Sequence, residues 1–438
     1  MDMTEVASAR LRAYNVGFGD CLLLTLTYTD NDRRSILIDF GSTQMPRSAP
    51  PSRMADVAAD IRTQTDGHLD MVVATHRHAD HISGFGSGPS GDIIEALRPG
   101  VVVQPWTEAP DLATNATAPR GTRTRDAMLA ATMNEMHSFA AGARAEGRRL
   151  KQGNDFPAVV ADKLAFLGET NLKNKAAVTR LMKMGARDAI YTKFGDDLTD
   201  PTLIPGVKIS VLGPPTLAQA PSIARQARTD ADEFWHLAGA WGMAAATGDA
   251  SGLDLNAVVA PLFPDAVVDL PKEAEWLVPR INRAYVSGMM SLLRVMDGVL
   301  NNTSVILLIQ IAGTRLLFPG DAQIENWSYA LFDAPNSEAI RAELADTHLY
   351  KVGHHGSLNA TPKTLWNHFE HRSTNGRDPR RLISVVSTLA GKHGTPQSRT
   401  EVPRKTLLAE LEAKSEFHST QDHSAAKRPW VDVDVPIY

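Results

Sequence analysis

The chain of 438 residues has a single cysteine, Cys21, which excludes a fold stapled by intrachain disulfides. Cys21 lies in the apolar run CLLLTLTY, where we expect a buried and unreactive thiol. The chain also lacks an internal repeat and an apolar run long enough to span a bilayer. Residues 1–15 contain no apolar signal-peptide core, so we expect a cytoplasmic protein with no membrane partner.

A strong excess of charge of either sign is absent as well. The formal net charge is −5 at pH 7, with 43% hydrophobic and 22% charged residues. This is the composition of an ordinary globular protein with a large core. It argues against wholesale non-specific binding of nucleic acid but leaves room for a local basic patch.

Short runs typical of strands and helices alternate along most of the chain. RLRAYNVGFGDCLLLTLTY and RSILIDFGS, joined by the polar turn TDNDRR, predict a hairpin. The helical stretches MADVAADIRTQ and GDIIEALRP each precede an expected strand, DMVVAT and GVVVQPW. Further strands are expected in GVKISVLG, TSVILLIQIAGTRLLF, HLYKV and RRLISVVS, and an edge strand in RPWVDVDVPIY. This alternation predicts an α/β fold in which helices pack on a sheet.

Two segments interrupt the alternation with alanine-rich, helically spaced sequence. They span about 110–153 and 218–298. We therefore expect a single domain, 1–438, that carries two helical insertions. The insertions could form the interface of a homo-oligomer or a lid over a functional site, and the sequence leaves this choice open.

The most informative motif is THRHADH, in which three histidines and an aspartate fall within residues 76–81, directly after the strand DMVVAT. Side chains two apart on extended backbone share a face, so His76 and His78 are predicted to point toward one spot. Asp80 and His81 can face a neighbouring spot. Imidazole and carboxylate donors suit zinc, iron or manganese, and the lack of thiolates argues against a closed structural zinc site. The cluster therefore predicts a metal site of the catalytic type.

A wider set of motifs, running from Asn15 to Pro396, gives this cluster a context: NVGFGD, ILIDFGS, THRHADH, NNTSVILL, FPGDA, VGHHGS and KHGTP. The set resembles the metallo-β-lactamase superfamily and is most similar to the ComEC-type domain of DNA-uptake competence proteins. The resemblance implies an αββα sandwich, two mixed β-sheets flanked by helices, with one or two metal ions at the sheet edges. The membrane channel of full-length competence proteins has no counterpart here, so transport is not implied.

The resemblance also implies roles for individual residues. His76, His78, Asp80 and His81 would be metal ligands, and Asp321 of FPGDA would bridge two cations. Asp39, the usual aspartate at a strand end, would orient a ligating histidine.

The superfamily usually has one further histidine between THRHADH and FPGDA. The histidines in this interval, His137 and His236, both lie in the expected insertions, where a surface or packing role is the simpler expectation. The first cation would then be held by His76, His78 and Asp321, with water or His355 completing its shell.

Three later histidines compete for the remaining positions. His355 stands where the final ligand of the superfamily often does, and His393 in KHGTP is an equal candidate. His354 is an alternative contact to the leaving group, and we count it with Asp80 as catalytic. Ser357 would bind substrate or cap a helix. Lys351 could neutralise a phosphate near the site, as could Lys392, although a solvated lysine is the default expectation.

The expected function is that of a metal-dependent hydrolase. A metal-activated hydroxide would attack a phosphodiester, in a nucleotide or a nucleic acid, with two Zn²⁺ ions as the expected cofactor and Mn²⁺ or Fe²⁺ as alternatives. The same site would serve hydrolysis of a lactone, thioester or amide. A noncatalytic metal-binding interaction module is the alternative from a different class.

Overall fold

The computed structural model describes residues 5–109, 148, 174–221, 300–357, 361–391, 401–423 and 428–438. The two expected insertions, about 110–153 and 218–298, fall almost entirely outside these ranges. His393 and Lys392 also lie outside the described residues, as do His137 and His236.

Two mixed β-sheets form the centre of the described structure. The seven-stranded sheet has the order β13-β1-β2-β3-β4-β5-β6, antiparallel from β13 to β3 and parallel from β3 to β6. Its strands are β1 (Val6–Tyr14), β2 (Cys21–Tyr28), β3 (Arg33–Phe40), β4 (Met71–Val73), β5 (Val101–Pro105), β6 (Ile190–Thr192) and β13 (Trp430–Val435).

The six-stranded sheet has the order β12-β11-β10-β9-β8-β7, antiparallel from β7 to β9 and parallel from β9 to β12. Its strands are β7 (Val207–Gly213), β8 (Ile306–Ile311), β9 (Thr314–Phe318), β10 (Leu349–Lys351), β11 (Ile383–Val386) and β12 (Glu416–Ser419).

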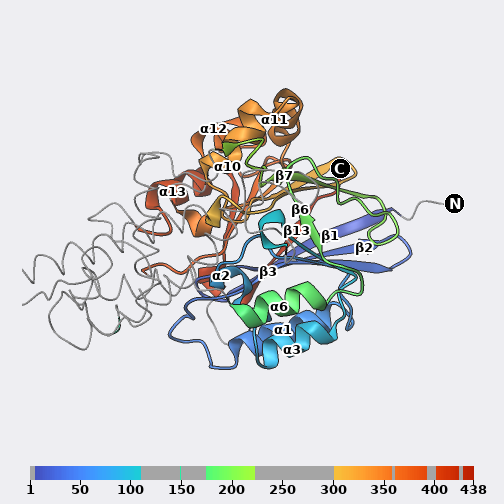
Figure 1. Ribbon diagram of the computed structural model, residues 1–438. Coiled ribbons are helices and arrows are strands. Elements are labelled where there is room, and N and C mark those ends of the chain that lie inside the picture. The colour runs from blue at the N-terminus through green and yellow to red at the C-terminus, as the bar shows by residue number, and fades with distance from the viewer. Residues whose placement is uncertain are drawn as a thin grey trace, which may run out of the picture.

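Helices cover the outer face of each sheet (Figure 1). The seven-stranded sheet carries α1 (Arg53–Gln64), α3 (Pro89–Ala96) and α6 (Lys175–Lys183). The six-stranded sheet carries α10 (Ile324–Ser328), α11 (Ser337–Ala345), α12 (Lys363–His368) and α13 (Lys405–Lys414). Shorter elements are α2 (Ala79–Ile82), the 3₁₀ turns Ser83–Phe85, Trp106–Glu108, His354–Gly356 and Thr420–His423, and a π-helical turn, Tyr329–Asp333.

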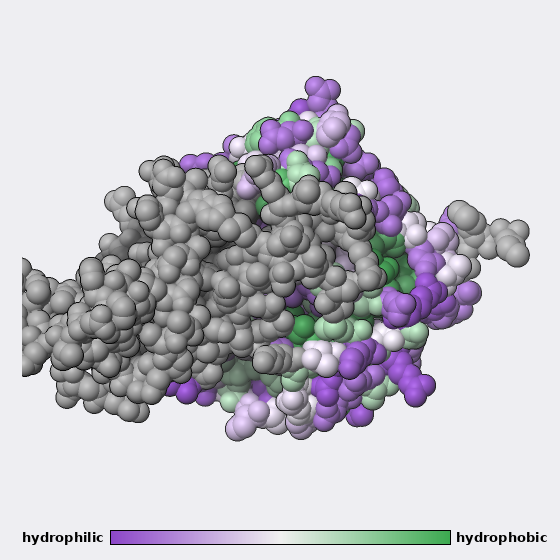
Figure 2. All heavy atoms as spheres, in the orientation of Figure 1, coloured by the Kyte–Doolittle hydropathy of each residue, from purple (hydrophilic) through white to green (hydrophobic). Residues whose placement is uncertain are grey.

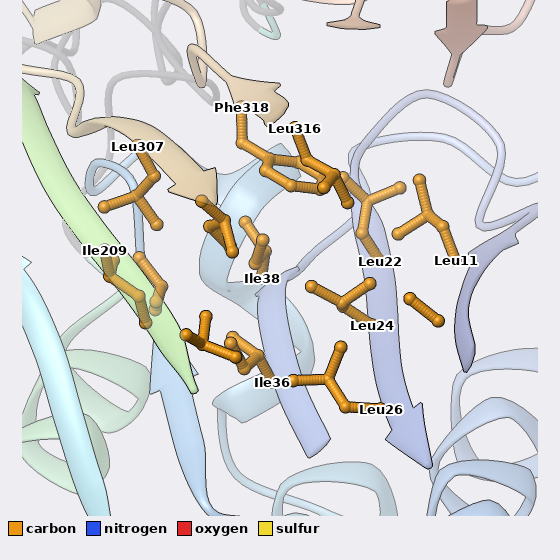
Figure 3. Close-up of a cluster of buried hydrophobic side chains, with 14 of the residues drawn as sticks. Leu11, Leu22, Leu24, Leu26, Ile36, Ile38, Ile209, Leu307, Leu316 and Phe318 are labelled. Atoms are coloured by element: carbon orange, nitrogen blue, oxygen red, sulfur yellow. The ribbon is translucent and has the colours of Figure 1, made fainter. Parts of the chain in front are cut away.

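The layers are held together by apolar side chains that alternate along the strands. Leu22, Leu24 and Leu26 of β2 point into the space between the sheets, whereas Leu23 packs under the helices on the outer face. This is the two-residue period of a strand that is buried on both faces. Figure 3 shows the inner layer, where side chains of β2 and β3 meet those of β7, β8 and β9. The two sheets are therefore fixed against each other by a common core.

The expected α/β class is confirmed, with two mixed sheets flanked by helices; membership in the metallo-β-lactamase superfamily stays a prediction. RPWVDVDVPIY is an edge strand, as expected. Cys21 is buried, and burial raises the pKa of its thiol well above the usual range, which agrees with an unreactive side chain. The helices α6, α10, α11, α12 and α13 and the strands β6 and β12 were not expected from the sequence.

The described part has polar residues at the rim of the face that Figure 2 shows, with hydrophobic residues in small patches. Large hydrophobic side chains that stay exposed are scattered, at Ile190, Ile324, Phe332 and Tyr438. None of the described helices is long and apolar enough to cross a membrane.

Shortening one inner side chain tests the packing between the sheets. Leu24→Ala removes a side chain that is fully buried in the common core, so we expect it to lower the free energy of unfolding by about 2–5 kcal/mol. Thr25→Ala removes a half-buried side chain of the same strand and should cost about 1 kcal/mol or less. Urea denaturation of both variants measures the difference, and equal losses would contradict the assigned core.

Candidate metal centre

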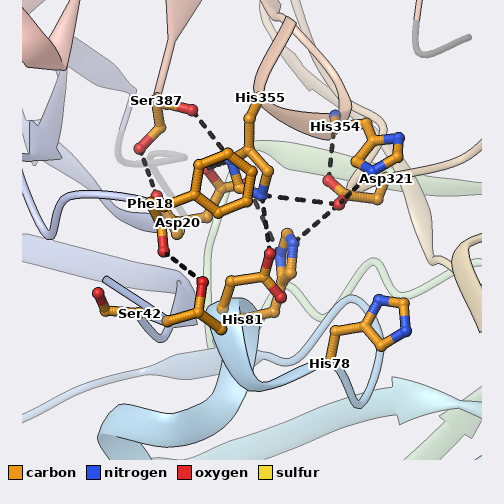
Figure 4. A network of polar contacts seen from close by, with 12 residues as sticks. Phe18, Asp20, Ser42, His78, His81, Asp321, His354, His355 and Ser387 are labelled. Carbon is orange, nitrogen blue, oxygen red and sulfur yellow. Dashed lines mark hydrogen bonds and ion pairs between the residues drawn. The ribbon is translucent and has the colours of Figure 1, made fainter. Parts of the chain in front are cut away.

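The sequence-predicted site residues meet where strand ends of the two sheets face each other. Asp39 lies at the end of β3, and the THRHADH segment follows β4 in the same sheet. Asp321 and His355 follow β9 and β10 of the other sheet. Side chains at the carboxyl ends of parallel strands share one edge of a sheet, and stacking the sheets brings these two edges together. Figure 4 shows the resulting cluster.

His76 and His78 point toward one spot, as their spacing predicts. Nε2 of His76 lies 2.9 Å from Nδ1 of His78. Both side chains are buried; burial lowers the pKa of His76 well below its usual range and that of His78 to about 4. The two rings are therefore neutral at pH 7 and can offer a nitrogen lone pair, the form in which histidine binds a metal.

Asp39 is fully engaged by the loop that carries the histidines. Its Oδ1 accepts the backbone N–H of Thr75 at 2.7 Å, and its Oδ2 accepts the Thr75 hydroxyl at 2.7 Å. Nδ1 of His81 lies 2.7 Å from the same Oδ2. Asp39 thus contacts His81 on the side of the ring that faces away from Asp321, which is the contact expected of a carboxylate that orients a ligand.

The principal group is formed by Asp80, His81, Asp321 and His355, whose donor atoms all lie within 4.8 Å of one another. Nε2 of His81 is 3.1 Å from Oδ2 of Asp321. Nε2 of His355 is 3.2 Å from Oδ2 of Asp80 and 3.7 Å from Oδ2 of Asp321. His355 therefore lies with Asp80 and His81, and Asp321 lies against both histidines.

Each of these two histidines presents a lone pair to a carboxylate when it is neutral. Nδ1 of His355 donates to the backbone oxygen of Ser387 at 3.0 Å, because a carbonyl can only accept, so Nε2 of the neutral ring carries no proton and yet faces Asp80. His81 lies between two carboxylates, Asp39 at Nδ1 and Asp321 at Nε2, so a neutral ring donates to one of them and turns its lone pair toward the other. Such a pairing is repulsive unless a proton or a metal cation lies between the two atoms.

The charges of the group shift its pKa values accordingly. Burial acts to lower the pKa of His81, but Asp321 and Asp39 outweigh it and raise this pKa well above the usual range. Burial likewise opposes the raised pKa of His355, which Asp321 and Asp80 bring about. Without a cation, protons on these rings neutralise the carboxylates, so the group as a whole attracts positive charge.

Strained backbone is concentrated here. His354 (φ 40°), His355 (φ 53°) and Asp39 (φ 57°) occupy the left-handed region, and they are three of seven described non-glycine residues with positive φ. This conformation is unfavourable in free energy for non-glycine residues, and it persists where surrounding contacts enforce it. In this protein it aims His355 into the group.

His354 lies at the edge of the group. Its backbone N–H donates to Oδ1 of Asp321 at 3.0 Å, while its Nε2 lies 3.9 Å from Oδ2. The side chain is 23% exposed, whereas that of His355 is fully buried. Ser357 Oγ lies 2.9 Å from His354 Nδ1, so the serine contacts this ring. His354 is thus the histidine of this turn that a substrate could reach.

Lys351 corrects one expectation. The default expectation of a solvated side chain is wrong, because Lys351 is 1% exposed and its Nζ contacts the carboxylate of Asp20. The reason is its place at the end of β10, where the stacked sheets enclose it. Asp20 of the motif NVGFGD was not among the expected site residues, and the structure brings it within 3.7 Å of both His81 and His355.

The turn VGFGD, residues 16–20, approaches the site. Gly19 has no room for a side chain, because a Cβ would lie 2.2 Å from the Gly41 oxygen and 2.7 Å from the Asp80 oxygen. The Phe18 ring packs on His355 with centroids 4.4 Å apart. Phe18 and Asp20 flank Gly19 in the motif NVGFGD. This motif is the sequence signal from which their roles could have been found.

A second group, Asp346, His348 and His371, also has metal-like composition. Its chemistry opposes a cation: Arg315 contacts Asp346, and Arg380 lies 3.8 Å from it. Nδ1 of His348 accepts the backbone N–H of Arg315 at 3.3 Å. Two guanidinium groups already neutralise the carboxylate, so we assign this group a structural role.

No protein-family model matches the chain, and no curated protein matches it significantly.

The loop that bears His76 and His78 is anchored by Arg77 between them. Arg77 Nε donates to Glu108 Oε1 at 2.8 Å, and both side chains are less than a tenth exposed. Glu108→Gln would leave a buried guanidinium without its counter-charge, so we expect a loss of about 3–5 kcal/mol in unfolding free energy. Glu95→Gln removes the half-exposed partner of Arg180 and should cost about 1 kcal/mol or less. Denaturation curves measure both, and a Glu108 variant as stable as the Glu95 variant would contradict the anchor.

Proposed function

We propose that the protein is a metal-dependent hydrolase of the metallo-β-lactamase type whose buried histidine–carboxylate group binds divalent cations. The observation that carries the proposal is that Nε2 of His81 and Nε2 of His355 each face a carboxylate oxygen, at 3.1 and 3.2 Å. Ligand atoms on a tetrahedral zinc lie roughly 3.3–3.6 Å apart when the bonds are about 2.0–2.2 Å, slightly more than the distances here. The spacing therefore suits ligands that share one ion.

Two sets of donors are available. Asp80, His81, His355 and Asp321 form one set. His76 and His78 would form the other with Asp321, whose carboxylate would serve both ions. The donors are imidazole and carboxylate, which favour Zn²⁺, with Mn²⁺ or Fe²⁺ as alternatives.

Charge also favours more than one cation. The buried carboxylates at the site are Asp20, Asp39, Asp80 and Asp321, and among the described residues Lys351 is the cation that contacts them. One divalent ion would leave this group with net negative charge when the histidines are neutral. Two ions would bring it close to neutrality once a hydroxide is included, so we favour a two-ion site.

The set with His76 and His78 lacks one histidine of the superfamily pattern, and Asn301 is the candidate to replace it. Its side chain is fully buried, and neither amide atom has a hydrogen-bond partner in the described structure. The turn that it begins touches both sides of the site: Ser304 Oγ accepts the Asp321 N–H at 3.2 Å, and the next residue, Val305, donates to Thr75 O at 2.9 Å. An amide oxygen is an acceptable ligand for a divalent ion.

When bound, the cations would lower the pKa of a water molecule to near neutrality and stabilise negative charge on the reacting oxygens. The protein's own residues would hold the geometry. Asp39 fixes the tautomer of His81, and the Ser387 carbonyl fixes that of His355. His354, partly exposed and in contact with Ser357, would contact the leaving group, and burial lowers the pKa of its ring.

A phosphodiester of a nucleotide or nucleic acid is the proposed substrate, on the strength of the resemblance to ComEC-type domains alone. The same centre could hydrolyse a lactone, thioester or amide. Turnover of bis-p-nitrophenyl phosphate against ester and lactone substrates, with and without chelator, separates these reactions. Bound metal without turnover on the whole panel would favour a noncatalytic metal-binding module.

The metal assignment is tested by His355→Ala. Loss of this ligand should lower hydrolysis at least about 100-fold and reduce the metal content measured by elemental analysis. His68→Ala is the matched control, since His68 is exposed and lies before β4, at the end opposite to the site. Unchanged metal content in the His355 variant, or hydrolysis that persists after chelation, would contradict the proposal.

Metal binding should also depend on pH. His81 and His355 must lose a proton to bind a cation, and their raised pKa values strengthen the competition from protons. The apparent affinity is therefore expected to fall as the pH falls, by about tenfold per pH unit for each proton displaced. Isothermal titration with Zn²⁺ in buffers of different ionisation enthalpy counts these protons, and binding without proton release would argue against histidine ligation.

A further inference from the structure

A buried ion pair joins the two sheets beside the candidate centre. Asp20 stands directly before β2 of one sheet, and Lys351 ends β10 of the other. Both side chains are 1% exposed and in direct contact. Burying two charges is costly, and well-packed apolar residues are often at least as stable as such a pair. Stability alone therefore gives no reason for an ion pair at this position.

Asp20 faces both ligand histidines of the principal group. Its Oδ2 lies 3.7 Å from Nδ1 of His81, and its Oδ1 lies 3.7 Å from Nδ1 of His355. Figure 4 shows the carboxylate beside the rings. At 3.7 Å neither Nδ1 is hydrogen-bonded to Asp20, and the near partners of these nitrogens are Asp39 and the Ser387 carbonyl. Asp20 thus acts on both rings through its charge rather than through a hydrogen bond.

The backbone holds this carboxylate in place. The Asp20 N–H donates to Asp80 O at 2.9 Å, and Ser387 Oγ donates to Gly19 O at 2.7 Å. The turn is therefore fixed to both halves of the site. Oδ1 of Asp20 is buried without a hydrogen-bond partner among the described residues, although buried carboxylate oxygens normally have one.

Lys351 balances this charge. Burial acts to lower the pKa of Lys351, but the charges of Asp20 and Asp321 raise it, so the amine keeps its proton. A single positive charge therefore lies against a site that contains several carboxylates. It offsets part of their attraction for a cation.

We propose that the Asp20–Lys351 pair sets the charge of the metal centre: Asp20 strengthens the binding of cations at His81 and His355, and Lys351 limits it. Both are positioning residues that act through the ligands. The inference rests on the proposed metal site and adds to it two charges whose removal has opposite effects on affinity.

The test is a charge cycle with Asp20→Asn, Lys351→Met and the double variant, read out by Zn²⁺ competition titration with a chromophoric chelator. We expect Asp20→Asn to weaken binding about tenfold or more and Lys351→Met to strengthen it by a similar factor. The double variant, which restores neutrality of the pair, should return to within about threefold of the original chain. It also removes the unpaired buried charge, so it remains informative if Lys351→Met does not fold.

Asp346→Asn is the matched control, because Asp346 also lies among an arginine and histidines but near the opposite end of the six-stranded sheet. It should leave the Zn²⁺ titration unchanged. Weakening by both single variants, or an effect of Asp346→Asn as large as that of Asp20→Asn, would overturn the proposed charge balance. An unmodified chain that binds no Zn²⁺ would instead overturn the proposed function itself.

Discussion

Carboxylates that are buried together must be neutralised, and much of the site's architecture follows from this requirement. Asp80 and Asp321 are almost completely shielded from water, and Asp20 and Asp39 lie close behind them. Each isolated buried charge would be expensive, and several of one sign repel one another. The histidine rings between them can neutralise the carboxylates by taking protons or, as we propose, by sharing metal cations with them.

The two stacked sheets supply the geometry in which such a cluster can form. The core between the sheets fixes the edge that carries Asp39 and His81 against the edge that carries Asp321 and His355. Each histidine is held from behind by an acceptor, so its free nitrogen has one direction in which to point. To point in that direction, His355 adopts a left-handed backbone conformation, which is unfavourable for a non-glycine residue.

Much of the fold could be predicted because short stretches of sequence determine the type of each element. The alternating run of β2 and the helical spacing of α1 are visible in a few consecutive residues. Helix α6 was missed: it lies in a basic, mixed segment without a clear run of either type.

The site residues also differ in how far local sequence predicts them. The common direction of His76 and His78 follows from their spacing of two residues, and Asp321 and His355 were found through the resemblance of their motifs. The pairing of Asp20 with Lys351 links residues 331 positions apart, and no local pattern encodes it. It arises from the stacking of the two sheets. For the same reason the sequence predicted a solvated Lys351 where the structure buries it.

The central claim is that the buried cluster holds divalent cations. A crystal structure of the protein grown with Zn²⁺, with diffraction data collected on both sides of the zinc absorption edge, tests it most directly. The account predicts an anomalous peak bounded by Asp80, His81, Asp321 and His355, and a second peak beside His76 and His78. The absence of a peak there, or a peak confined to Asp346, His348 and His371, would contradict it.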